Sequence, residues 1–296
     1  MTNPILQLMP TPYRLRRATY ENAYSPTNSN GNFASAYALR SLVDPIPLLT
    51  QEYEAGASCE QTYGDVLKGA DGGGDHSFAN LLINDARQVF QEAALSTLSV
   101  APSQWRAVSA LPQDWMKPNV EGFEEAVFHP KRHKLTGLGH QFQTLDPGKP
   151  LALQLFNETG ARPARPETEV EKVTISVLQV NISRPWLDMA LFKTRGWSLP
   201  GQPAGFVSNG KINASNTGLF PLVVTGFLIG QTLSVSAKFA TEDEMLLKSG
   251  AASDAAIGPF CFPADEKLRQ HPKKKPPELY LFGMVSQALP FSPNPD

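Results

Sequence analysis

Three histidines, His129, His133 and His140, have the spacing in this chain that is most typical of metal chemistry. On a helix the first two would lie on one face, as paired zinc ligands do. Three cationic side chains lie between and beside them: Lys131, Arg132 and Lys134. These charges would repel a dication, and Pro130 stands where a zinc protease carries its glutamate. We therefore expect a solvated basic loop and no metal site, and we predict no cofactor.

Two basic runs are candidate binding sites for an anionic surface. They are Lys131 with Arg132, and Lys273 with Lys274 and Lys275. If the fold brings the runs together, they would form a cationic patch for phosphate, for an acidic lipid or for an acidic protein. The alternative is structural, because lysines that precede a strand protect its edge against pairing with another chain. We favour the structural interpretation and keep these residues as candidates.

The densest group of residue types found at binding hot spots is Arg184 with Trp186, followed by Arg195 with Trp197. Tryptophan and arginine are enriched among the residues that dominate binding free energy in protein interfaces. The same types also fill cores and form structural ion pairs. These four residues are candidate binding residues, and packing is the favoured alternative for Trp186.

Motifs for nucleotide binding and catalysis are incomplete. The run from Gly205 to Lys211 fits a phosphate-binding loop, but Ile212 replaces the hydroxyl residue that would hold magnesium. Asn209-Gly210 within that run instead favours a hairpin turn. No nucleophile elbow is present, and the glutamate after Cys59 would raise the pKa of its thiol.

A second imidazole, His76, follows Asp71 and Asp75 on a glycine-rich segment. Calcium loops need ligands at alternate positions closed by a distant glutamate, and that pattern is absent here. Capping of the following helix explains the same residues. In an enzyme whose site is dispersed in sequence, these groups would be candidates together with the three histidines at 129, 133 and 140, because imidazole titrates near neutral pH.

Hydrophobic periodicity predicts the elements that would position these side chains. The clearest is a helix from Ser77 to about Leu95, whose apolar residues recur at steps of three and four. They are Phe78, Leu81, Leu82, Ala86, Val89, Phe90 and Ala93. Strands are predicted near 151–155, 173–182, 222–239 and 279–289. Shorter helices are predicted near 48–53, 120–128, 185–196 and 242–247.

These elements predict an α+β fold with an antiparallel β-sheet or sandwich built mainly from residues 150–290. Helices would pack on it, and a loop-rich N-terminal segment would wrap it. Prolines mark residues 160–168 as a connector between a loop-rich and helical part, 1–159, and a β-rich part, 169–296. One continuous domain is the alternative.

The composition is that of a soluble globular protein. The chain has 296 residues, of which 41% are hydrophobic, and a formal net charge of −2. This charge makes nucleic acid an unlikely partner, because such binding depends on clustered Lys and Arg. No apolar run is long enough for a transmembrane helix, and the N-terminal residues do not resemble a signal peptide. We expect a cytoplasmic protein, with export without a signal peptide left open.

The absence of a complete catalytic motif favours a non-enzymatic binding or assembly protein that acts through surface complementarity. Its partner would be another protein or a second copy of the chain. A membrane-active or toxin-like protein is the first alternative, because the run Thr232 to Phe239 is amphipathic and a small-residue segment, 250–258, lies close behind it. An enzyme with a dispersed site is the second.

Overall fold

The structure is a computed structural model that describes residues 3–15, 39–50, 54–94, 106–116, 120–139, 141–145, 151–157, 160–252, 254–263 and 279–296. The chain divides into two compact units. Unit 1 comprises Met1–Arg17, Trp115–Val180 and Phe227–Val285, and unit 2 comprises Ala18–Asp114, Asn181–Gly226 and Ser286–Asp296. Each unit is described by itself.

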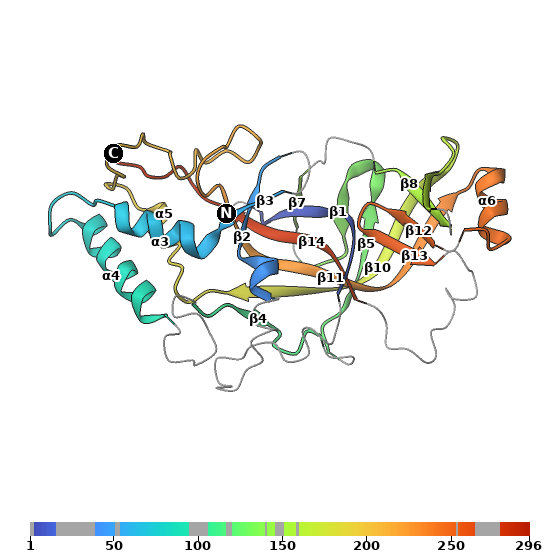
Figure 1. Cartoon of the computed structure of the whole chain (residues 1–296), viewed down its shortest axis with the longest axis horizontal. Helices are drawn as coiled ribbons and strands as arrows, with labels where there is room; N and C mark the ends of the chain where they lie inside the picture. Colours follow the sequence, from blue (N-terminus) through green and yellow to red (C-terminus); the bar gives the residue numbers. More distant parts are fainter. Residues whose placement is uncertain are drawn as a thin grey trace. The chain divides into compact units, whose positions relative to one another are not determined.

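The fold is α+β and is dominated by sheets, as the sequence predicts (Figure 1). One sheet has eight strands in the order β6-β5-β10-β11-β14-β1-β7, with β4 paired to β10. Its strands are β1 (Ile5–Leu15), β4 (Ser109–Leu111), β5 (Glu124–His129), β6 (Lys134–Thr136), β7 (Gln143–Thr144), β10 (Glu169–Ser183), β11 (Leu222–Lys238) and β14 (Leu279–Ala288). β10 pairs antiparallel with β5, whereas β1 and β7 are parallel.

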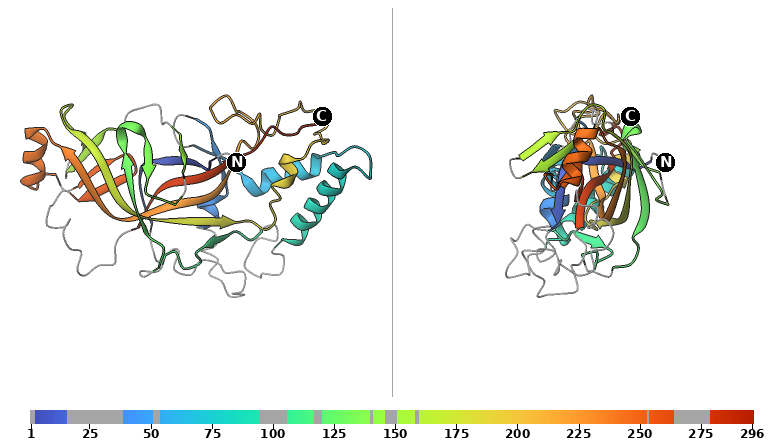
Figure 2. Two further views of the ribbon diagram at one scale, coloured as in Figure 1. Left: turned by 180° about the vertical axis from the view of Figure 1, so that it is seen from behind. Right: turned by 90° about the vertical axis from the view of Figure 1, so that its right-hand side faces the viewer.

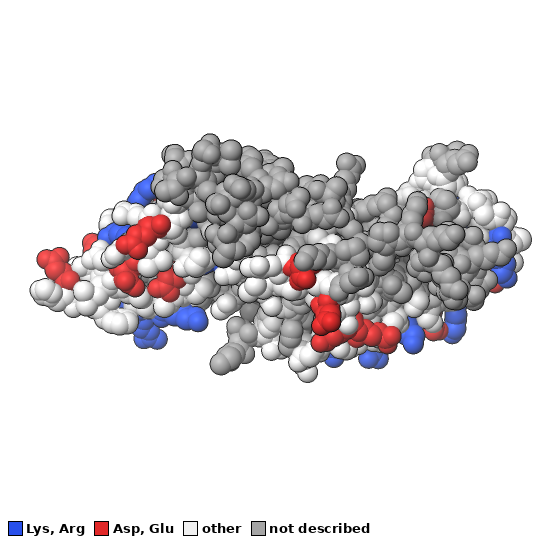
Figure 3. All heavy atoms as spheres, turned by 90° about the horizontal axis from the view of Figure 1, so that it is seen from below, with Lys and Arg blue, Asp and Glu red and all other residues white. Residues whose placement is uncertain are grey.

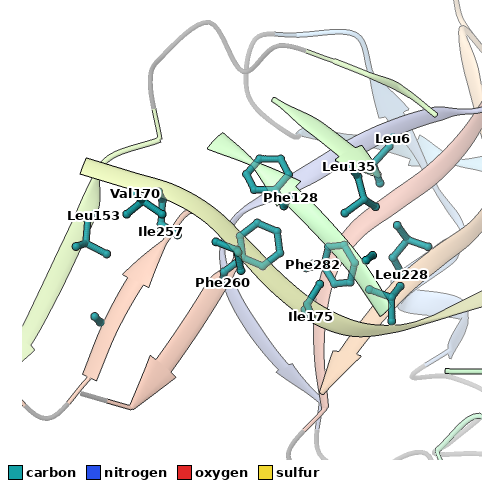
Figure 4. Close-up of a cluster of buried hydrophobic side chains, with 14 of the residues drawn as sticks. Leu6, Phe128, Leu135, Leu153, Val170, Ile175, Leu228, Ile257, Phe260 and Phe282 are labelled. Carbon is teal, nitrogen blue, oxygen red and sulfur yellow. The ribbon is translucent and has the colours of Figure 1, made fainter. Parts of the chain in front are cut away.

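A second sheet has four strands in the order β13-β12-β8-β9. They are β8 (Leu153–Asn157), β9 (Gly160–Pro163), β12 (Asp254–Ile257) and β13 (Phe260–Pro263). Side chains of this sheet pack against the eight-stranded sheet in the core of unit 1. The rings of Phe128, Phe260 and Phe282 join the two sheets, with centroids 4.9 Å and 5.5 Å apart (Figure 4). Unit 1 is therefore a sandwich, as predicted.

The predicted connector at 160–168 begins with β9, which is the edge strand of the four-stranded sheet. In its register Arg162 faces Leu155, and the amide of Ala164 donates to the carbonyl of Leu153. In an antiparallel pair of strands, hydrogen-bonded and non-hydrogen-bonded residue pairs alternate. Because Ala164 is hydrogen-bonded to β8, the nitrogen of Pro163 points away from β8, where a proline removes no hydrogen bond between the strands. Both neighbouring segments, 151–157 and 169–180, belong to unit 1.

A buried carboxylate, Asp243, holds the turn after β9 against α6 (Thr241–Lys248). The side chain is 0% exposed. It accepts hydrogen bonds from Nη2 of Arg162 at 2.7 Å, from the backbone nitrogen of Arg165 at 2.8 Å and from Oγ1 of Thr168 at 2.6 Å. Burial alone would raise the pKa of Asp243, but these donors lower it below its usual value.

Three helices lie together in unit 2 (Figure 2). They are α3 (Cys59–Gly69), α4 (Phe78–Glu92) and α5 (Ala190–Lys193). Ser77 caps α4 by accepting a hydrogen bond from the amide of Asn80 at 3.0 Å, as the sequence predicts. Gly72 packs so closely against the first turn of α4 that a Cβ there would lie 2.3 Å from the Asn80 nitrogen. Of the three glycines in this run, Gly72 is therefore the one that the close approach requires.

Several predicted elements are wrong in type or length. The N-terminal segment is not only a wrap, because it contributes β1, the two-stranded sheet β2 (Pro45–Leu48) and β3 (Glu54–Ser58), and α3. Residues 124–129 form β5 where a helix, 120–128, was predicted. Leu48, the first residue of the helix predicted near 48–53, ends β2, and residues 51–53 lie outside the described residues. The helix expected over 185–196 is reduced to α5. The strands predicted near 153, 173, 222 and 279, and α6, are confirmed.

We predict that Asp243→Asn lowers the free energy of unfolding by about 2–3 kcal/mol, because it removes the charge that three donors surround. Since the folded-state pKa is below the ordinary value of about 3.9, this stabilisation is present above about pH 4 and is lost as the pH falls through the folded-state pKa. Urea unfolding at several pH values measures both effects. The matched control is Glu242→Gln, an exposed partner of Arg165, which should change stability by less than about 1 kcal/mol. Equal effects of both variants would contradict the role of Asp243.

Candidate functional site

The predicted basic loop of unit 1 lines an open cleft of about 790 Å³. Lys131 belongs to the short 3-10 helix η1 (Pro130–Arg132), and His133 follows it in a left-handed conformation with φ of 45°. Apolar side chains form the floor: Leu151, Leu153, Val170 and Ile257. Charged side chains line the rim: Lys131, Arg165, Glu167 and Glu169.

This cleft offers little free binding surface. Its floor residues Leu153, Val170 and Ile257 are already buried in the core of unit 1 (Figure 4). Two of its rim cations are paired with carboxylates, because Lys131 contacts Glu169 and Arg165 contacts Glu242. The apolar floor of the cleft therefore offers little surface that could anchor a ligand. Its cations Lys131 and Arg165 are already paired with carboxylates.

The second predicted basic run, Lys273, Lys274 and Lys275, lies outside the described residues, as does His140. Lys131 and Arg132 are exposed. On the face drawn in Figure 3, the described surface carries Lys and Arg side chains interspersed with Asp and Glu. His129, half-buried at the end of β5, is not part of the cleft lining given above.

Arg184, a candidate binding residue, is buried and acts as a link between segments of unit 2. Its guanidinium donates Nη1 to the carbonyl of Val224 in β11 and Nη2 to the carbonyl of Val43. Burial lowers the pKa of Arg184, while the nearby Cys59 and Asp44 act in the opposite direction. These contacts support the structural interpretation of this residue.

The other members of that group differ in their exposure. Trp186 is fully buried, and its Nε1 donates to the carbonyl of Ala107 at 2.7 Å. It lies in an aromatic cluster with Tyr63 and Phe90, at centroid distances of 6.1 Å and 5.8 Å. Trp197 is also buried, whereas Arg195 is exposed. Of the four, Arg195 alone is placed to meet a partner.

A charged network lies next to this cluster. Glu60 is buried and pairs with Arg40 at 2.6 Å and with Arg106 at 3.1 Å. The guanidinium carbon of Arg106 also lies 3.4 Å from the ring centroid of Phe90, a cation–π contact. Burial raises the pKa of Glu60, and the two arginines partly offset this effect. The sequence analysis missed this network, because its members are far apart in the chain.

Cys59 is buried beside this network, and burial raises the pKa of its thiol to about 12. The Arg184 guanidinium lowers that pKa but does not overcome burial. Both cysteines are free thiols, so no long-range disulfide joins Cys59 to Cys261. The expectation that Cys59 is a poor nucleophile agrees with its environment.

Another candidate imidazole, His76, lies on an exposed turn with Asp71 and Asp75. Asp71 accepts a hydrogen bond from the amide of Gly73 at 2.9 Å, which stabilises the turn. No group of three or more His, Cys, Asp and Glu side chains within the described part of the chain is arranged to hold a metal ion.

The run around Asn209-Gly210 is a loop and not the predicted hairpin. Asn216 bridges it by donating Nδ2 to Oγ of Ser208 at 3.1 Å and to the carbonyl of Lys211 at 3.0 Å. Gly210 has a φ of 75°, the positive value that the Asn-Gly pair predicts. No helix follows the run, so the context of a phosphate-binding loop is missing.

The amphipathic run of β11, which motivated the membrane alternative, is a half-buried strand. Its apolar side chains pack against the core of unit 1: Leu233, Val235, Ala237 and Phe239. None of the helices in the described residues combines the length and apolar character needed to cross a bilayer.

The sequence analysis also missed a surface on α4. The helix turns Ala79, Ile83 and Ala86 inward, and the ring of Phe90 packs against Tyr63 and Trp186. Of the residues predicted to face the core, Phe78, Leu81 and Val89 are exposed instead. We name the exposed apolar surface beside this buried side the free face of α4. It consists of Phe78, Leu81, Leu82, Asp85, Val89 and Glu92, whose spacing places them on one side of the helix.

Large apolar side chains of the free face are in contact with water. Phe78 is 72% exposed, Leu81 is 56% exposed and Val89 is 37% exposed. The apolar residues of α4 thus occupy two sides of the helix, one buried and one exposed. The signal in the sequence was an apolar arc wider than the single stripe of an ordinary surface helix.

Comparison of the chain with models of protein families, with curated proteins and with solved structures gives no match. Its function is therefore inferred from its own residues.

We predict that Arg184→Met lowers the free energy of unfolding by about 3 kcal/mol, because two buried carbonyls lose their donors. Arg184→Lys should recover little of this loss, since an ammonium group cannot reproduce the planar fork of a guanidinium. The exposed Arg195→Met is the matched control, with an expected change below about 0.5 kcal/mol. Chemical denaturation measures all three, and an Arg184→Met variant as stable as the control would contradict the linking role.

Cys59 should resist alkylation in the folded protein. With a pKa of about 12, only about one thiol in ten thousand is ionised at pH 8, and the thiolate is the reactive form. Treatment with iodoacetamide followed by peptide mass spectrometry should show Cys261, which is half-buried, modified first. Denaturant should make both cysteines reactive. Equal labelling of both thiols in the native protein would be inconsistent with this environment.

Proposed function

We propose that the protein is a non-enzymatic binding protein and that the free face of α4 is a surface through which it contacts another protein. The observation that carries the proposal is the exposure of Phe78 and Leu81 on a well-anchored helix. The proposal keeps the protein partner, or self-association, and the cytoplasmic location expected from the sequence.

The size of the exposed apolar surface supports binding. Complete burial of a phenylalanine or leucine side chain gains about 1.5–3 kcal/mol. With exposed fractions of 72% for Phe78 and 56% for Leu81, a partner that covers them gains roughly 1–2 kcal/mol from each side chain. Aromatic and aliphatic anchors of this size are typical of the centre of a protein interface.

The helix that carries the face is held firmly in unit 2, so binding needs little ordering of its backbone. Arg87 donates Nε to the carbonyl of Leu67 at 2.8 Å and Nη2 to the carbonyl of Ala70 at 2.7 Å, which ties α4 to the end of α3. The ring of Phe90 lies 5.5 Å from that of Tyr63. The free face is therefore presented by a preformed element.

The alternatives have weaker support in the described residues. The run that suggested membrane insertion has partly buried apolar side chains that pack against the core of unit 1. The groups that suggested an enzyme belong to different units, with His76 on an exposed turn of unit 2 and His133 in the cleft of unit 1.

We predict that the double variant F78S/L81S loses protein association without losing stability, because both side chains are exposed in the monomer. Wild-type protein should capture a partner from the native lysate, or self-associate in size-exclusion chromatography with light scattering. The double variant should do neither.

The control is M245S, which removes an apolar side chain of α6 that is 57% exposed. It should associate like the wild type. The proposal fails if the wild type is a strict monomer that captures nothing, or if F78S/L81S keeps every association of the wild type.

A further inference from the structure

The charged side chains of α4 and of the segment just before it are mainly carboxylates. Between Asp71 and Ala94 the chain carries four carboxylates and one arginine, and all four carboxylates are exposed: Asp71, Asp75, Asp85 and Glu92. Asp85 and Glu92 belong to the free face itself. The segment holds no lysine.

The one arginine of this segment does not neutralise the face. Arg87 is half-buried and is bonded inward to the carbonyls of Leu67 and Ala70. Its third contact is neutral, from Nη1 to Oδ1 of Asn84 at 3.1 Å. The free face therefore combines apolar anchors with the exposed carboxylates of Asp85 and Glu92, which the arginine of this segment does not neutralise.

This charge disfavours a second copy as the occupant. Asp85 is the middle residue of α4. A two-fold antiparallel pairing of two α4 helices about their middle would place the two Asp85 carboxylates opposite each other. Like charges placed together at an interface oppose association. An anionic lipid surface is disfavoured for the same reason.

We propose that the partner of the free face is an amphipathic helical segment that carries large apolar side chains flanked by Lys or Arg. This inference rests on the proposed function and adds the chemistry of the partner. Apolar side chains of the segment would cover Phe78, Leu81 and Val89, and its cations would pair with Asp85 and Glu92. Such pairing fixes register and orientation, while the apolar contacts supply most of the affinity.

The test uses two helical peptides with the same leucine stripe, one with lysine and the other with glutamate at its polar positions. Binding to the full-length protein is followed by fluorescence anisotropy. The lysine peptide should bind at least about tenfold more tightly than the glutamate peptide. The F78S/L81S variant should bind the lysine peptide about tenfold more weakly than the wild type does. The D85K/E92K variant should bind the glutamate peptide more tightly than the lysine peptide. The controls M245S and E244K, both on α6, should behave like the wild type.

The outcomes separate this inference from the proposed function. If the wild type binds both peptides equally and F78S/L81S binds neither, the face binds protein but its charge does not select the partner. If neither peptide binds and the wild type sediments as a dimer that F78S/L81S dissociates, the occupant is a second copy. Binding to phosphatidylcholine vesicles that F78S/L81S abolishes, without peptide binding, would identify a lipid surface. Each of these results overturns the inference, and failure of the lysine peptide to bind does so in every case.

Discussion

Unit 2 depends on one buried cation, the guanidinium of Arg184, which bonds the backbone carbonyls of Val43 and Val224. A buried charge costs several kcal/mol unless donors and acceptors are matched around it. The planar fork of arginine satisfies both carbonyls only when the chain after β10, the strand β11 and the segment that ends at Val43 are correctly arranged. Because the alternative arrangements leave a charge and two carbonyls unpaired, this contact selects one arrangement of three segments that are far apart in the sequence.

The same constraint explains why residue type alone could not separate the exposed candidates for binding from the buried ones. Trp186 is of a residue type that is common at binding hot spots, but it fills the core next to Tyr63 and Phe90. Of the candidates in this part of the chain, Arg195 remains exposed. Arginine and tryptophan serve burial and binding equally well, since each combines a large apolar body with directional donors. Their role is decided by whether carbonyls of the same chain reach those donors, which depends on tertiary contacts.

Elements with a clear period were predictable, and elements fixed by tertiary contacts were not. The β-branched alternation of β10 and β11 and the spacing in α4 identified them. By contrast, α3 contains Gly64, a poor helix former, and depends on packing: a Cβ at that position would lie 3.0 Å from the ring of Phe90. In β5, the residues Glu124 to Ala126 favour a helix, but pairing with β10 makes them a strand. The Arg40, Glu60 and Arg106 network has no local signature at all.

The free face of α4 follows from the way in which helices pack. Small side chains, Ala79 and Ala86, together with Ile83, form the buried side and let α4 approach its neighbours α3 and α5 closely. A hydrophobicity sum gives more weight to Phe78 and Leu81, and so the side predicted to face the core included these exposed residues along with Phe90, which does pack inward. Close packing selects side chains by shape and not by hydrophobicity alone. Phe78, Leu81 and Val89 are then left in water, and a partner that covered them would offset the free-energy cost of their exposure.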